Sequence, residues 1–166
     1  MSFNIAGIFF YLLSIKLTDS KNFALITTSI FFVYPYLFGH AQINGKDIPF
    51  LTLWLICTYY LFIIVENFYN DKKIIILNII LISVFTALLI SVRITGVLIL
   101  LEYLIAIIIL INLKSIKPLK FFLKNSWCLL IFLTALTLLI YILNPIFWHN
   151  PLEFFKSVSW MGKFYH

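Results

Sequence analysis

Hydrophobic residues fill long runs of this chain, and short polar connectors separate the runs. The runs occupy residues 3–17, 23–38, 48–65, 74–90, 96–113 and 127–146. An α-helix crosses a bilayer with about 20 apolar residues, and the shorter runs need tilt or snorkelling ends to do so. The pattern predicts an all-α fold, a polytopic transmembrane helix bundle of about six spans over residues 1–146, followed by a tail over residues 147–166.

The composition places the chain in the membrane. Apolar residues make up 63% and charged residues 11% of the chain, and the mean hydropathy is +1.08. Soluble proteins carry roughly a quarter charged residues. The tail is rich in aromatic side chains, which are typical of membrane interfaces, so it is predicted to lie along the outer surface. Both cysteines, Cys57 and Cys128, fall inside predicted spans, where neither a disulfide nor a metal site is expected.

The net charge of +6 comes from lysines that gather on alternate connectors. Eight of the twelve basic residues share one predicted side of the membrane: Lys16, Lys21, Lys72, Lys73, Lys114, Lys117, Lys120 and Lys124. Cytoplasmic loops are enriched in lysine and arginine, so this side is predicted to be cytoplasmic. The chain is then a multi-pass protein of the cell (inner) membrane, with both termini and the other connectors facing the periplasm or lumen. No nucleic-acid partner is implied.

The connector "FGHAQINGKDIPF", residues 38–50, gathers His40, Asn44, Lys46 and Asp47 between two apolar runs. One interpretation is a solvated turn, in which Asn44 tolerates positive φ and Asp47 complements the dipole of the next helix. The other is a site at the outer bilayer surface that faces a charged lipid headgroup, with His40 able to carry a proton. No further histidine or cysteine follows at metal-ligand spacing, so no metal site is predicted.

Two charged residues stand apart from the connectors rich in lysine. Arg93 is the only arginine, and at mid-membrane it would cost about 2.5–3.5 kcal/mol, so it is predicted to lie in an outer turn. Its planar guanidinium suits a phosphate, although a snorkelling anchor is the alternative. Glu102 lies about two turns inside the fifth run. It is either functional or simply protonated or hydrogen bonded to a neighbouring helix.

Three segments together resemble a known family. "YPYLFGHAQINGKDIPFLTLWLICTYYLF", "SVRITGVLILL" and "NPIFWHNPLEFFKSVSWMGKF" occur in this order and cover most of the chain. They are similar to segments of bacterial polytopic glycosyltransferases of the GT-C class, relatives of the polyprenyl-phosphate-mannose protein O-mannosyltransferases (glycosyltransferase family 39). The resemblance implies a membrane enzyme that transfers a sugar from a polyprenyl-phosphate donor to an acceptor at the periplasmic or luminal face. It implies no cofactor.

The resemblance also suggests roles for individual residues. Arg93, Lys46, His40 and Asn44 are expected to bind the lipid phosphate or substrate, and Asp47 to support catalysis. Where the family usually has proline, this chain has Gly45. Such enzymes carry an essential acidic motif in a first outer loop that this sequence does not supply, so we expect the chain to be a fragment or a reduced relative that works with a missing segment or partner subunit.

A non-catalytic membrane protein is the alternative. It would be an assembly partner for a larger transferase or a small transporter. Transporters often show spans broken by glycine or proline at matching positions in two halves. The runs here contain few of either residue, which makes the transporter the less favoured form of this alternative.

Overall fold

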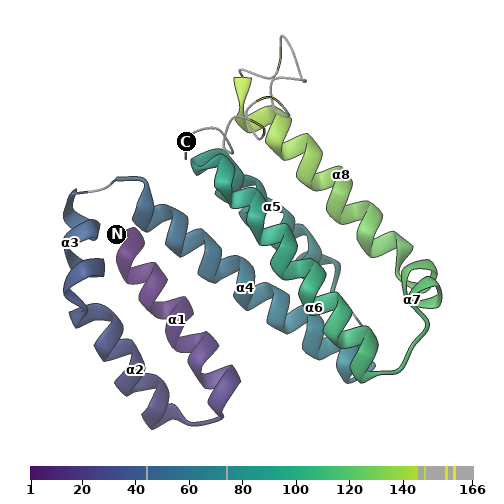
Figure 1. Cartoon of the computed structure of the whole chain (residues 1–166), viewed down its shortest axis with the longest axis horizontal. Helices are drawn as coiled ribbons and strands as arrows, with labels where there is room; N and C mark the ends of the chain where they lie inside the picture. The colour runs from purple at the N-terminus through teal and green to yellow at the C-terminus, as the bar shows by residue number, and fades with distance from the viewer. Residues whose placement is uncertain (44, 74, 146–147, 149–155, 157–158, 160–166) are drawn as a thin grey trace. The chain divides into compact units, whose positions relative to one another are not determined.

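The computed structural model describes residues 1–166 except 44, 74, 146–147, 149–155, 157–158 and 160–166. This described part is helical and contains no strand, which confirms the predicted all-α class. In chain order the elements are α1 (Ser2–Thr18), α2 (Lys21–Val33), α3 (Pro35–Ile43), α4 (Asp47–Tyr69), α5 (Ile76–Val92), the 3₁₀ helix η1 (Ile94–Leu98), α6 (Ile99–Leu113), α7 (Pro118–Lys124) and α8 (Ser126–Leu143) (Figure 1).

Three helical segments of the described chain are long and apolar enough to cross a membrane. They are α4 with 23 residues, η1 and α6 together with 20, and α8 with 18, and their mean hydropathies are 2.2, 2.8 and 2.4. The helices α1, α2 and α5 are apolar but shorter. These segments support a multi-pass membrane protein. The prediction that the chain crosses the membrane six times, and the predicted direction of each crossing, stay predictions.

The second apolar run, residues 23–38, is two helices, and the prediction of one continuous span there is wrong. α2 ends at Val33 and α3 begins at Pro35, with Tyr34 between them in an extended conformation (φ −60°, ψ 113°). A residue that precedes proline is pushed out of the helical region by steric contact with the proline ring. Because α3 then continues to Ile43, the first half of the predicted outer loop is helical.

The structure divides into two compact units, Met1–Tyr59 and Tyr60–His166, which are described separately. In the first unit, α1 packs against α2 through phenylalanine rings. Phe31 is buried, and its ring stacks on Phe3 at 5.5 Å and on Phe10 at 4.9 Å between centroids. Aromatic packing of this kind fixes the antiparallel pair of helices at the start of the chain.

α5 is the most buried helix of the second unit. Its buried residues are Ile79, Ile82, Ser83, Thr86, Ala87, Leu89 and Ile90. Ala87 and Ile90 pack against Leu136 of α8. On the α6 side, the hydroxyl groups of Thr86 and Tyr103 form a buried hydrogen bond of 2.7 Å. α5 therefore connects α6 and α8.

Gly96 allows η1 to pass close to the end of α5. A Cβ atom at this buried position would lie 2.8 Å from the carbonyl oxygen of Leu89 and 3.0 Å from the amide nitrogen of Ile90. Such contacts are too short for any side chain, so this close approach of two backbones requires glycine.

The predicted interfacial tail, residues 147–166, lies mostly outside the described residues. Within its described part, the indole Nε1 of Trp148 donates a hydrogen bond of 2.7 Å to the carbonyl oxygen of Tyr141 in α8. This bond holds the start of the tail to the last turn of α8.

Candidate functional site

The polar connector of the first unit brings two of its predicted site residues together. His40 lies in the last turn of α3, and Asp47 is the first residue of α4. The His40 Nδ1 atom is 3.6 Å from Asp47 Oδ2, and the two side chains are 35% and 28% exposed. The ring of Tyr36, one turn earlier in α3, lies 4.3 Å from the imidazole between centroids. When the imidazole is protonated, this geometry makes an ion pair that remains open to solvent.

Helix geometry explains this meeting. Tyr36 and His40 are four residues apart and therefore lie on one face of α3. Asp47 stands at the positive end of the α4 dipole, where a carboxylate is stabilised. The start of α4 is held in turn by Thr52, whose hydroxyl donates a hydrogen bond of 3.0 Å to the carbonyl oxygen of Ser2.

The other predicted residues of the connector are less fully described. Lys46 is exposed in the turn before α4, and its carbonyl accepts a hydrogen bond of 3.1 Å from the Phe50 amide. Asn44 lies outside the described residues. The two interpretations of the connector therefore both stay predictions: the α4 start is a structured turn, and it also carries a histidine–aspartate pair.

Arg93 occupies the turn between α5 and η1. Its backbone is extended (φ −147°, ψ 129°), its amide donates to the Leu89 carbonyl at 3.1 Å, and its own carbonyl accepts from the Gly96 amide at 2.8 Å. The side chain is exposed. Arg93 belongs to the second unit and His40 and Asp47 to the first, so their convergence into one site stays a prediction.

A hydrogen-bonded pair beside Arg93 is absent from the sequence predictions. The Asn144 side-chain amide donates to the Ser91 hydroxyl at 2.9 Å and to the Ile140 carbonyl at 2.9 Å. Ser91 in turn donates to the Ala87 carbonyl at 2.8 Å. The only local signal for this pair was the position of Asn144 at the end of the last apolar run, directly before a proline.

Glu102 lies closer to a helix end than the sequence suggested. Because η1 takes up residues 94–98, the α-helix itself begins at Ile99, and Glu102 is in its first turn. The side chain is half-buried. A carboxylate at this place complements the helix dipole, which favours the structural interpretation of this residue.

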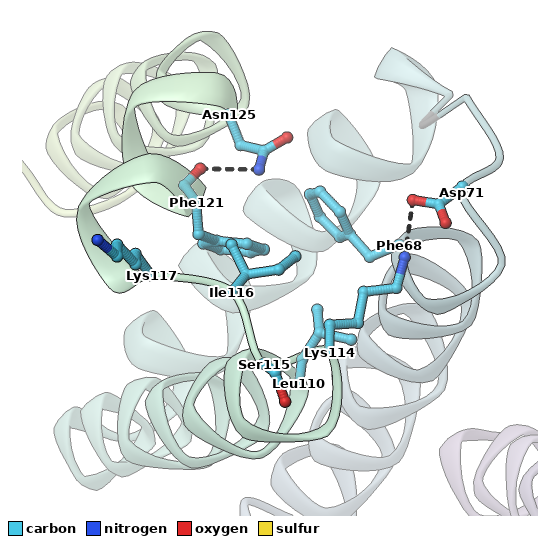
Figure 2. Close-up of a pocket in the computed structure, with 9 residues that line it drawn as sticks. All are labelled: Phe68, Asp71, Leu110, Lys114, Ser115, Ile116, Lys117, Phe121 and Asn125. Atoms are coloured by element: carbon cyan, nitrogen blue, oxygen red, sulfur yellow. Dashed lines mark hydrogen bonds and ion pairs between the residues drawn. The ribbon is translucent and has the colours of Figure 1, made fainter.

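A pocket of about 440 Å³ lies between the C-terminal ends of α4 and α6 and the helix α7, whereas Arg93 precedes η1, at the start of the segment formed by η1 and α6 (Figure 2). Lys114 donates to Asp71 at 2.7 Å on one side of it, and Asn125 donates to the Phe121 carbonyl at 2.8 Å. The lining residues are Phe68, Asp71, Leu110, Lys114, Ser115, Ile116, Lys117, Phe121 and Asn125. The lysines of this region predicted only the topology, and nothing in the hydropathy pattern indicated the pocket.

No group of three or more histidine, cysteine, aspartate or glutamate residues in the described part of the chain is placed to hold a metal ion. Comparison with known protein families, curated proteins and solved structures found no match to this chain. The function is therefore argued from the residues and their geometry.

Proposed function

We propose that this chain is a membrane glycosyltransferase, or part of one, that transfers a sugar from a polyprenyl-phosphate donor to an acceptor at the periplasmic or luminal face. The observation that carries the proposal is the pairing of His40 with Asp47 at 3.6 Å inside the motif "FGHAQINGKDIPF". An imidazole beside a carboxylate, at the start of a 23-residue apolar helix, is a suitable group to accept or orient a proton near the membrane.

In the proposed reaction an acceptor hydroxyl attacks the anomeric carbon of the sugar. The bond from that carbon to the phosphate oxygen breaks, and the polyprenyl phosphate leaves with the electron pair. The hydroxyl proton passes to a carboxylate. Asp47 supports this proton transfer, and His40 orients the Asp47 carboxylate. Lys46 supplies positive charge for the developing phosphate dianion, Asn44 supplies hydrogen bonds to the donor, and Arg93, in the second unit, is a proposed phosphate-binding residue.

An assembly partner of a larger transferase is the second candidate function. The observation that favours it is the apolar surface of α8, an 18-residue helix in which only Leu136 is buried. A second membrane helix packs against such a surface, but lipid tails cover it equally well. The paired motif is the more specific observation, so we place the transferase first.

Two measurements test the proposal: donor binding by the protein in nanodiscs, and sugar transfer by the protein together with the expected missing segment or partner subunit. Arg93→Lys keeps the charge and loses the two-point grip on phosphate. We expect it to weaken binding of a photoreactive polyprenyl-phosphate sugar about tenfold to a hundredfold, which corresponds to one charge-assisted hydrogen bond of about 1.5–3 kcal/mol. Asp47→Asn should leave donor binding intact and lower transfer.

The matched control is Asp19→Asn, which removes an exposed carboxylate from the turn between α1 and α2. It should change neither donor binding nor transfer. If the wild-type protein crosslinks the donor no better than a neutral polyprenyl alcohol, or if all three variants behave like the wild-type protein, the transferase proposal is wrong.

A further inference from the structure

The pocket of the second unit has an apolar floor and a charged rim (Figure 2). The side chains of Phe68, Leu110 and Phe121 form the floor, and the last two are buried. Lys114 and Asp71 lie on one side of the rim, and Lys117 lies on the other. A site of this kind accepts a ligand with an anionic head and an apolar body.

The ion pair in the rim is asymmetric in its exposure. The Lys114 side chain is only 17% exposed, whereas the Asp71 side chain is 79% exposed. Most of the Lys114 side chain is covered, but its hydrogen bond to Asp71 is exposed, so the ammonium group lies at the rim of the pocket within reach of solvent. The Asp71 carboxylate is well exposed, so another anion in solution or at a membrane surface can compete with it for Lys114. A different anion can therefore take its place on Lys114, while Lys117 adds positive charge on the far side of the rim (Figure 2).

The surroundings of the pocket indicate where such an anion comes from. The neighbouring leucines point away from the protein: Leu113 at the end of α6 is 67% exposed, and Leu119 and Leu123 of α7 are 73% and 69% exposed. Exposed leucines beside lysines are typical of a helix that lies at the membrane interface. This is the depth of phospholipid headgroups, and basic pockets between membrane helices bind anionic headgroups.

We propose that this pocket binds an anionic phospholipid, with the phosphodiester on Lys114 in place of Asp71 and the start of the acyl chains on the apolar floor. The site is separate from the His40–Asp47 pair and does not depend on the proposed transferase activity. Bound lipid would brace the junction of α4, α6 and α7.

Native mass spectrometry of the purified protein, titrated with phosphatidylglycerol or phosphatidylcholine, measures this binding directly. Lys114→Gln should weaken phosphatidylglycerol binding about tenfold to a hundredfold, as expected for loss of a charge-assisted hydrogen bond. Asp71→Asn removes the competing carboxylate and should tighten binding severalfold. Asparagine suits this position, which has a positive φ of 53°.

Two matched variants separate a specific pocket from general surface charge. Lys72→Gln removes an exposed lysine that does not line the pocket, and it should weaken binding by no more than about fivefold. Asp19→Asn removes an exposed carboxylate from a position with φ 52° in the first unit and should not reproduce the gain of Asp71→Asn. Equal effects of Lys114→Gln and Lys72→Gln, or of the two aspartate variants, would overturn the proposal.

Two further measurements complete the test. Inorganic phosphate at millimolar concentration should not displace phosphatidylglycerol, because it lacks the apolar body, and displacement would identify free phosphate as the ligand instead. If Lys114→Gln does not fold, the phosphatidylglycerol affinities of Asp71→Asn and Asp19→Asn are sufficient to test the proposal. Equal binding of the two phospholipids by the wild-type protein would also contradict the proposal.

Discussion

Because Gly96 has no side chain, the backbone of η1 can lie close to the end of α5. Since a Cβ atom there would meet the Leu89 carbonyl at 2.8 Å, we expect Gly96→Ala to lower the free energy of unfolding by about 1–3 kcal/mol, as overpacking does. Denaturant titration of the purified protein in detergent measures this change. The control is Gly39→Ala in α3, where a Cβ meets nothing within 4 Å and alanine should be neutral or stabilising. A Gly96→Ala variant as stable as the Gly39→Ala variant would contradict the packing.

Some residues could be placed from the sequence because their energetic cost is local. Arg93 is costly inside lipid, and this alone predicted its position in a turn. Asp47 was predicted at a helix start for a similar reason, the helix dipole. The contact of Asn144 was not predicted, because its partner, Ser91, lies 53 residues away in the sequence. An asparagine at a helix end does not indicate which distant hydroxyl group it will contact. The distance between Asp47 and His40 likewise depends on the direction of α3 relative to α4, and the hydropathy pattern does not predict that direction.

Among the helices, α5 and α6 are joined by one buried polar contact. Thr86 also donates to the Ile82 carbonyl at 2.6 Å, so Tyr103 is the donor of the bond between the two hydroxyls. Tyr103→Phe should lower the free energy of unfolding by about 0.5–1.5 kcal/mol, the range for a hydrogen bond between membrane helices. Tyr69→Phe, at an exposed position at the end of α4, is the control and should change stability little. If both variants unfold alike, the bond does not contribute.

The helices themselves were largely predictable, and the exceptions have physical causes. The runs at residues 3–17 and 48–65 became α1 and α4 because apolar length alone determines such helices. Pro35 alone indicates a helix break, but the apolar run continues on both sides of it, and the run predicted a single span. α7 was not predicted, because its seven residues are too short to give a hydropathy signal and it forms by packing Phe121 against Phe68.

At the scale of the whole molecule, the predicted topology places the connector at residues 38–50 outside the cell and the connector after α6 inside. After removal of Cys57 and Cys128, a cysteine at position 44 should react with a membrane-impermeant thiol reagent in intact cells, and a cysteine at position 115 should not. Both positions should react once the cells are opened. The reverse pattern in intact cells would overturn the positive-inside assignment and, with it, the outer location of the proposed site.

The break between α2 and α3 has a consequence for depth in the bilayer. Pro35 has no N–H to offer the carbonyl four residues earlier, and lipid-exposed backbone outside regular helix does not occur within the hydrocarbon layer. Tyr34 and Tyr36 are 52% and 64% exposed, and tyrosine prefers the headgroup region. α2 has 13 residues, about 20 Å of helix at 1.5 Å per residue, so the bilayer must thin around it if α2 spans the membrane and the break marks the level at which hydrocarbon ends. His40, one turn beyond Tyr36, then lies among the headgroups, where the donor of the proposed reaction would approach by lateral diffusion with its chain still in the lipid.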